Sequence, residues 1–229
     1  VIDFVTIAST GNATDFGNLI DSRATGGGCS NQTRGLFGGG NPAADSSKTN
    51  SIEYITIAST GNAQDFGDLL AATASITGAT ANTTRGIWGG GYTPTVLNTI
   101  QFVTIATLGN TQDFGDATSA MYENQAAASA TRGLFAGSST TPGHESAIDY
   151  ITIASTGNAT SFGDLIQAAG STFGGGNASS TRAVFATDNS GKDDLEYVII
   201  QTTGNAVDFG DLNLPRDLGA AFSNGHGGL

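Results

Sequence analysis

The stretch "YITIASTGNAQDFGDL" at Tyr54–Leu69 is one of five copies of the same segment in this 229-residue chain. Close copies begin at Phe4 and Tyr150, and looser copies begin at Phe102 and Tyr197. Aligned on the isoleucine or leucine that opens each copy, the repeats start at Ile2, Ile52, Ile100, Ile148 and Leu195. A period of roughly 40–50 residues is typical of solenoids, propellers and arrays.

One repeat reads as four short β-strands. Ile52–Ile57, "IEYITI", is rich in β-branched and aromatic residues, which favour strands. Gly61-Asn62 supplies a turn, and "QDFGDL" at Gln64–Leu69 follows as a second strand. The small residues of Ile76–Thr84 can form a third strand, and "RGIWGGG" at Arg85–Gly91 a fourth. Because no window shows sustained helical periodicity, four antiparallel strands per repeat predict a propeller blade.

The two ends of the chain favour a closed propeller over the alternative, an array of flat stacked hairpins. The chain begins with the second half of a repeat, and "LGAAFSNGHGGL" at its end aligns with the first half at Thr25–Leu36. Residues 1–22 and 213–229 would then share one closing blade, which removes exposed sheet edges. We therefore predict an all-β fold: one domain over residues 1–229, a five-bladed β-propeller with four antiparallel strands per blade, closed by pairing of its terminal segments.

The small residues of the third strand indicate its place in the ring. Segments such as "GGGCSNQT" and "NQAAASAT" contain almost no bulky side chain. The innermost strand of a narrow ring must approach its neighbours closely, and large side chains would clash there. We therefore expect this strand to be innermost and the Asp-Phe-Gly-Asp strand to be outermost. Packing between blades is expected around five phenylalanines: Phe16, Phe66, Phe114, Phe162 and Phe209.

Composition excludes several function classes. The net charge of −12 disfavours binding to nucleic acid or to an anionic membrane surface. No apolar run reaches the roughly 18 residues of a membrane span, and no signal peptide pattern is present. The single cysteine, Cys29, cannot form a disulfide within the chain and is expected to be a small buried residue. The start at Val1, inside a repeat, suggests an excised domain, a processed product or an incomplete chain.

The strand order resembles the Kelch repeat. "LFGGG" and "IWGGG" match its aromatic-glycine-glycine strand, "IEYITI" matches the strand that carries a tyrosine, and Arg23 and Arg216 match the arginine before the next blade. The middle blades lack that arginine, and phenylalanine replaces the outer-strand tryptophan of Kelch. The resemblance is closer to Kelch-like repeat proteins encoded by marine bacteriophages, on "TRGLFGGG" (Thr33–Gly40), "STRAVFA" (Ser180–Ala186) and "IDYITIASTGNATSFGDL" (Ile148–Leu165).

This resemblance covers almost the whole chain and implies a module of a virion or tail fibre, located on a virion or outside the cell. We therefore expect a non-catalytic β-propeller that serves as a structural or adhesion module. A lectin-like propeller with repeated glycan sites is the alternative. The partners expected are other virion proteins or cell-surface glycans, with no nucleic acid and no membrane insertion. The sequence leaves the oligomeric state open.

Comparison of the repeats with one another separates two faces. The "ASTGNA" loop and the "NQTRG" corner hardly change, and propeller geometry puts both on one face. The loops expected on the other face differ in every copy. Binding residues often lie on loops held by a rigid scaffold, so the ligand-binding candidates are Tyr92, Tyr122, His144 and Arg23, although unrestrained drift also explains the variation. The repeated asparagines of the uniform face are either sugar sites or parts of turns.

Four arginines recur at the start of the fourth strand: Arg34, Arg85, Arg132 and Arg182. We interpret them as partners of carboxylates in the "DFGD" segments, such as Asp65 and Asp113, in internal ion pairs. A ring of cations that binds an anion is the functional alternative.

The sequence shows no catalytic constellation. His144 and His226 are the only histidines and Cys29 the only cysteine, which gives weak support for a metal site. "DFG" occurs with no other kinase element. We therefore expect no enzyme activity, no cofactor and no metal.

Overall fold

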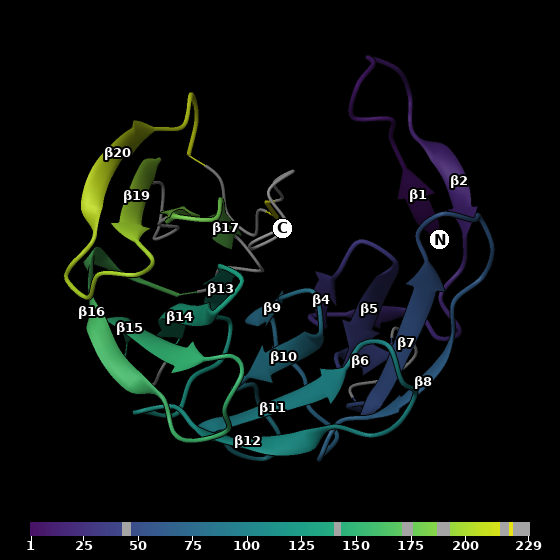
Figure 1. Ribbon diagram of the computed structural model, residues 1–229, viewed down its shortest axis with the longest axis horizontal. Helices are drawn as coiled ribbons and strands as arrows, with labels where there is room; N and C mark the ends of the chain where they lie inside the picture. The colour runs from purple at the N-terminus through teal and green to yellow at the C-terminus, as the bar shows by residue number, and fades with distance from the viewer. Residues whose placement is uncertain (43–46, 140–142, 171–175, 187–192, 216–219, 222–229) are drawn as a thin grey trace.

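The computed structural model shows an arc of β-sheets, four of which are four-stranded blades of a β-propeller (Figure 1). The structure describes residues 1–229 except 43–46, 140–142, 171–175, 187–192, 216–219 and 222–229. No helix occurs among the described residues, and hence none that could span a membrane. Four sheets have four strands each, as the repeat predicts.

The four complete blades follow one another along the chain, and every strand pairing in them is antiparallel. The first blade contains β4 (Gly27–Ser30), β5 (Arg34–Gly38), β7 (Ser51–Thr56) and β8 (Gln64–Asp68). The second contains β9 (Ala79–Ala81), β10 (Arg85–Gly89), β11 (Thr99–Thr104) and β12 (Gln112–Asp116). The third contains β13 (Gln125–Ala128), β14 (Arg132–Ser139), β15 (His144–Thr152) and β16 (Thr160–Ala169). The fourth contains β17 (Gly176–Ala178), β18 (Arg182–Ala186), β19 (Asp194–Ile199) and β20 (Val207–Asp211).

Two smaller sheets complete the described structure. β1 (Ile2–Phe4) and β2 (Thr14–Gly17) form the N-terminal hairpin, which corresponds to the two outer strands of a blade. β3 (Arg23–Ala24) pairs with β6 (Asn41–Pro42) beside the first blade.

The prediction of five four-stranded blades is therefore wrong for the described chain, whereas the predicted closure by residues 1–22 and 213–229 falls largely outside the described residues. The structure has four four-stranded blades and a two-stranded hairpin, and Figure 1 places β1–β2 and β20 at opposite ends of the arc. The inner strands of the expected closing blade fall in 213–229, most of which lies outside the described residues. The prediction transferred the strand pattern of complete repeats to a terminal segment that lacks the Thr-Arg pair shared by all four of them.

The small-residue strands lie innermost, as predicted. β4 contacts β9, β9 contacts β13, and β13 contacts β17, and all four surround the centre of the arc in Figure 1. The approach is close enough to restrict side-chain size, because a Cβ added at Gly176 would overlap the backbone of Ala126 on the neighbouring strand. Glycine and alanine in this strand are therefore a packing requirement.

Three hydrophobic clusters fill the spaces between consecutive blades. The cluster between the first two blades contains Leu36, Ile52, Phe66 and the fully buried Trp88. The indole N–H of Trp88 donates to the Gly27 carbonyl oxygen of the preceding blade (3.1 Å), so its polar edge is satisfied. Corresponding clusters join the second blade to the third and the third to the fourth. Each blade is thus packed mainly against its sequence neighbours.

A β-bulge in each blade positions the phenylalanine of "DFG". In the first blade Ile52 pairs with Gly67 and Glu53 with Asp65, which leaves Phe66 as the extra residue without a partner on β7. Such a bulge bends the strand and leaves backbone groups outside the ladder. The Phe66 side chain is directed into the core and its ring packs edge-on against Tyr54 (5.9 Å between centroids). The register shift recurs at the same position in the hairpin and in all four blades.

A Gly-Asn loop of each blade binds the bulge of the preceding one; we call it the Thr-Gly-Asn loop, although in the second blade Leu108 replaces the threonine. Gly109 N–H donates to the Phe66 carbonyl oxygen (2.8 Å), and Thr111 N–H donates to the Asp68 carbonyl oxygen (2.8 Å). Asn110 Oδ1 accepts the Asp68 N–H (3.1 Å). We call this set of three hydrogen bonds the inter-blade clasp. It occurs four times, with Gly61, Gly109, Gly157 and Gly204 on Phe16, Phe66, Phe114 and Phe162 respectively.

The clasp accounts for the glycine of "DFG". Gly67 has a φ of +147°, and a Cβ there would overlap the carbonyl of Gly109 from the next blade. Gly17, Gly115 and Gly163 meet the same obstacle, whereas Gly210 at the open end of the fourth blade has nothing within 4 Å of its added Cβ. The positive φ and the close approach of the next blade's backbone therefore both require glycine at the four clasped positions.

We expect Gly67→Ala to lower the free energy of unfolding by about 1–3 kcal/mol more than Gly210→Ala, because only Gly67 carries the overlap in addition to the backbone strain. Chemical denaturation of both variants gives the comparison. Equal losses would show that the positive φ, and not the clasp, determines the cost.

The five phenylalanines that were expected to pack between blades divide as these glycines do, into four that are covered and one that is not. Phe16, Phe66, Phe114 and Phe162 are buried, as predicted, but Phe209 is 50% exposed. The prediction failed for Phe209 because no following blade covers β20 among the described residues, although Phe209 still packs edge-on against Tyr197 (6.0 Å).

We expect Phe66→Ala to cost about 3–5 kcal/mol of unfolding free energy, and Phe209→Ala, measured on the monomer at low protein concentration and low salt, about 0.5 kcal/mol or less, as is usual at the surface. Phe66 is only 2% exposed, so its truncation leaves a cavity. Thermal or urea unfolding measures both. A large loss for Phe209→Ala would mean that a partner covers β20 in solution.

Candidate functional site

The recurring arginines join neighbouring blades. Arg34, Arg85 and Arg132 each donate to the backbone carbonyl oxygen of an isoleucine in the next blade, at 2.6, 2.5 and 2.9 Å. Each guanidinium also stacks on the aromatic ring of its own blade, 4.2–4.8 Å from the ring centroid. Arg182 stacks on Tyr197 in the same way (4.4 Å) but, within the part of the chain that the structure describes, has no isoleucine carbonyl to reach.

These contacts replace the ion pairs expected from sequence. Among the described residues, Arg34, Arg85, Arg132 and Arg182 form no salt bridge, and Asp65 and Asp113 accept from none of them. Carbonyl oxygens and aromatic faces are the observed partners, and both suit a planar guanidinium. The functional alternative, a ring of cations that binds an anion, is also weakened, because three of the four guanidiniums already donate hydrogen bonds to backbone carbonyl oxygens within the fold.

Arg23 forms the one ion pair of the described residues, with Glu53. Its side chain is 5% exposed and also donates to the carbonyl oxygens of Gly39 and Ser51 (3.1 and 3.0 Å). Arg23 was predicted as a ligand-binding candidate, but the structure places it inside the first blade as a packing residue.

Glu53 belongs to a recurring polar position in the strand that precedes each Thr-Gly-Asn loop. The position is occupied by Glu53, Gln101, Asp149 and Glu196, all buried. Each side chain accepts a backbone N–H from the segment that leaves the preceding blade: those of Ile20 (2.7 Å), Leu70 (2.8 Å), Thr118 (2.8 Å) and Ile166 (2.6 Å). This side chain therefore fixes the backbone of the segment that follows the outer strand of the preceding blade, and its role is structural.

Glu196 is the least compensated member of this set. Ala169 stands where Arg23 precedes the first blade, so the cation that pairs with Glu53 has no counterpart at this position, and Glu196 Oε1 has no hydrogen-bond partner among the described residues. Burial raises the pKa of Glu196 above its ordinary value of 4.5, and the nearby Asp194 and Asp208 add to this, against the lowering effect of the Ile166 and Gln167 N–H groups.

We expect Glu196→Gln to stabilise the protein at neutral pH and to have less effect near pH 4. The folded state holds the Glu196 proton more tightly than the unfolded chain, so the free energy of unfolding falls as pH rises from 4.5 through the raised pKa. Glutamine removes that penalty and can keep the hydrogen bond, as Gln101 does to Leu70.

Melting temperatures across pH 4–8 test this expectation, with Glu53→Gln as the matched control. Glu53→Gln leaves buried Arg23 without its carboxylate, so it should destabilise by about 3–5 kcal/mol. Parallel curves for wild type and Glu196→Gln at all pH values would contradict the assignment.

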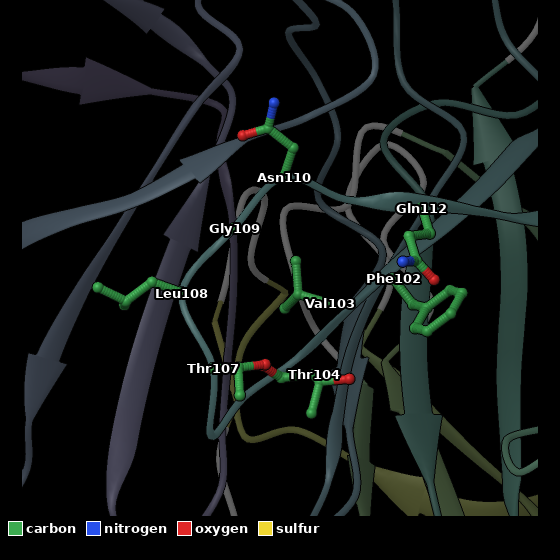
Figure 2. Close-up of a pocket in the computed structure, with 8 residues that line it drawn as sticks. All are labelled: Phe102, Val103, Thr104, Thr107, Leu108, Gly109, Asn110 and Gln112. Carbon is green, nitrogen blue, oxygen red and sulfur yellow. The ribbon is translucent and has the colours of Figure 1, made fainter.

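The uniform face carries a shallow hollow of about 290 Å³ at the Thr-Gly-Asn loop of the second blade (Figure 2). Its lining residues are uncharged: Phe102, Val103, Thr104, Thr107, Leu108, Gly109, Asn110 and Gln112. Figure 2 shows Leu108 on the loop, directed away from Phe102 and Gln112. The asparagine oxygens needed for repeated sugar sites are already used, because Asn62, Asn110, Asn158 and Asn205 accept clasp hydrogen bonds.

The corner before each arginine is likewise structural. Asn31 Oδ1 accepts the N–H groups of Thr33 and Arg34 (both 2.9 Å), which fixes the turn, and its Nδ2 donates to the Thr83 carbonyl oxygen of the next blade (3.0 Å). Asn82 repeats this arrangement one blade further on. The repeated asparagines of the uniform face therefore serve turns and junctions.

The variable face brings two predicted residues together. Tyr92 follows β10 and Tyr122 precedes β13, and their rings lie 6.2 Å apart at an interplanar angle of 51°. Tyr92 is 40% exposed, and Lys48 Nζ lies 4.7 Å from the centroid of its ring. Sequence analysis did not identify Lys48, which comes from a loop whose neighbouring residues 43–46 are not described.

Backbone pairing holds both tyrosines in place. Tyr92 exchanges two hydrogen bonds with Ala74 (2.8 and 2.9 Å), and the Tyr122 carbonyl oxygen accepts the Ser139 N–H (3.0 Å). Ser139 in turn pairs with His144 across β14 and β15. Because adjacent strands lie about 4.8 Å apart, His144 is about 10 Å from Tyr122. We call Tyr92, Tyr122 and Lys48 the tyrosine platform, whereas the His144 side chain lies against Gly170.

Little acid–base or metal chemistry is assembled in the described structure. No group of three or more histidine, cysteine, aspartate or glutamate side chains with metal-binding geometry occurs among the described residues. The Cys29 thiol packs against Gly86 of the second blade, and burial raises its pKa to about 12. This agrees with the predicted packing role of Cys29.

No protein-family model matches the chain, and no curated protein matches it significantly in sequence. The class that the fold defines is the β-propeller.

Proposed function

We propose that the protein is a non-catalytic recognition module in which a rigid arc of blades presents its variable face to a ligand. One observation carries the proposal: the residues that recur in every repeat are used in contacts between blades, whereas the tyrosine platform lies in loops that differ between repeats. A scaffold built in this way leaves its loops free to vary without loss of the fold.

The resemblance to Kelch-like repeats of marine bacteriophages supports a setting in a virion or tail fibre, outside the cell. In that setting the module would act in adhesion or in attachment to other virion proteins. The flanking coding sequence tests this part of the proposal. Neighbouring virion or fibre genes would support it, and a position within a metabolic operon would contradict it.

A carbohydrate is the ligand class that the tyrosine platform fits best. Two aromatic rings with fixed backbones offer apolar faces to a sugar ring and hydroxyl groups to its polar edges at low entropic cost. Lys48 adds a cation that can pair with an acidic sugar. This refines the lectin-like alternative, because it places one site on the variable face in place of repeated sites on the uniform face.

We expect the wild-type protein to bind one or more members of a glycan array, and Tyr92→Ala and Tyr122→Ala each to weaken that binding at least tenfold. Leu108→Ala, in the hollow of the uniform face, is the matched control and should bind as wild type does. Loss of binding in Leu108→Ala alone would move the site to the hollow. Absence of any glycan binding by the wild type would contradict the carbohydrate proposal and leave a purely structural module.

A further inference from the structure

Every junction between complete blades consists of the same three polar contacts. The inter-blade clasp joins the Thr-Gly-Asn loop to the bulge of the preceding blade. An arginine donates to an isoleucine carbonyl oxygen of the following blade. A buried carboxylate or amide in the following blade accepts a backbone N–H from the preceding blade's exit segment. The two blades at a junction thus contribute different, complementary groups.

The fourth blade has the groups that a preceding blade contributes to such a junction, but these groups have no partner from another blade among the described residues. Phe209, Gly210 and Asp211 stand where Phe66, Gly67 and Asp68 are clasped, but nothing lies within 4 Å of an added Gly210 Cβ. Arg182 is stacked on Tyr197 and has no carbonyl partner within the described chain. Apolar side chains are exposed around this edge, including Ile199, Val207 and Phe209.

The N-terminal hairpin has the groups that a following blade contributes to such a junction, and these too have no partner from another blade among the described residues. Gly11 and Asn12 stand where Gly109 and Asn110 form the clasp, and they make no hydrogen bond to another blade in the described structure. Asp3 occupies the position of Gln101 and Asp149, yet it is exposed. Ile7 corresponds to Ile105 and Ile153, whose carbonyl oxygens accept from arginine, and it is exposed together with Phe4 and Val5.

We propose that the N-terminal hairpin of one copy docks on the fourth blade of a second copy and completes a fifth junction of the same kind. Gly11 N–H then donates to the Phe209 carbonyl oxygen, Asn12 Oδ1 accepts the Asp211 N–H, and the Arg182 guanidinium reaches the Ile7 carbonyl oxygen. Within the chain the clasp and the capped exit segment each occur four times and the arginine contact occurs three times, so the docking continues an established interface.

A second copy is favoured over the chain's own hairpin because the two halves lie at opposite ends of the arc, with β1–β2 and β20 apart in Figure 1. The two surfaces differ, so the contact is heterologous and head-to-tail, and repetition produces larger rings or filaments. The net charge of −12 on every copy opposes the association, and salt screens that repulsion. Association is therefore expected to strengthen as ionic strength rises.

Disulfide trapping tests the proposal in a Cys29→Ala background. One preparation carries Asn12→Cys and a second carries Asp211→Cys. On mixing under mild oxidation, we expect covalent dimers of one copy of each to form at least tenfold faster than the homodimers of either preparation alone. Adding Gly210→Val to the second preparation should reduce the rate to that of the homodimers, because its side chain fills the place of the docking loop.

Two further measurements separate the alternatives. A chain with both Asn12→Cys and Asp211→Cys should give a ladder of covalent oligomers, whereas an internally bridged monomer would show closure within one chain and overturn the proposal. Asp68→Cys with Asn110→Cys, at a clasp that is formed within the chain, is the control for disulfide geometry. Sedimentation of the unmodified protein should show a mass that rises with concentration and salt, and a monomer under all conditions would also overturn the proposal.

Discussion

The hydrogen bond from the Thr-Gly-Asn loop to the bulged phenylalanine carbonyl is the interaction on which the arrangement of the blades depends. The bulge takes the carbonyl of Phe66 out of its own ladder, and the next blade supplies the donor from Gly109. A buried carbonyl without a donor is costly, so neither repeat is complete without the other. The glycine of "DFG" and the Gly-Asn pair, both present in all five copies, form the two sides of this one contact.

Much of the fold can be predicted from the sequence because the repeat is itself a structural unit. Its period, its four strands and the innermost place of the glycine- and alanine-rich strand all follow from local pattern and packing. The number of blades does not follow, because the terminal halves were assumed to behave like interior repeats. Phe209 shows the difference: it stands in the same Asp-Phe-Gly-Asp-Leu segment as Phe66 but lacks the neighbour that would bury it.

The candidate site was predictable only in part. Variation between repeats identified Tyr92, Tyr122 and His144, and the structure brings the two tyrosines together. The same reasoning misjudged Arg23, because an arginine in a variable loop gives no sign of a carboxylate 30 residues away. It also misassigned the partners of Arg85, since a sequence shows carboxylates but does not show which backbone carbonyl a fold will bring near. The sequence of one repeat shows which groups can donate or accept hydrogen bonds, but it does not show whether their partners lie in the same blade or in a neighbouring one.

The direction of the clasp has a consequence for synthesis of the chain. Each bulge is completed by an asparagine loop that lies 41 to 44 residues further along the sequence. On the ribosome, the outer strand of a blade therefore remains open until the following repeat has emerged and folded back onto it. We therefore expect assembly to proceed from the N-terminus, with each newly made blade sealing its predecessor, so that the bulge of the last blade made is the one left without its clasp.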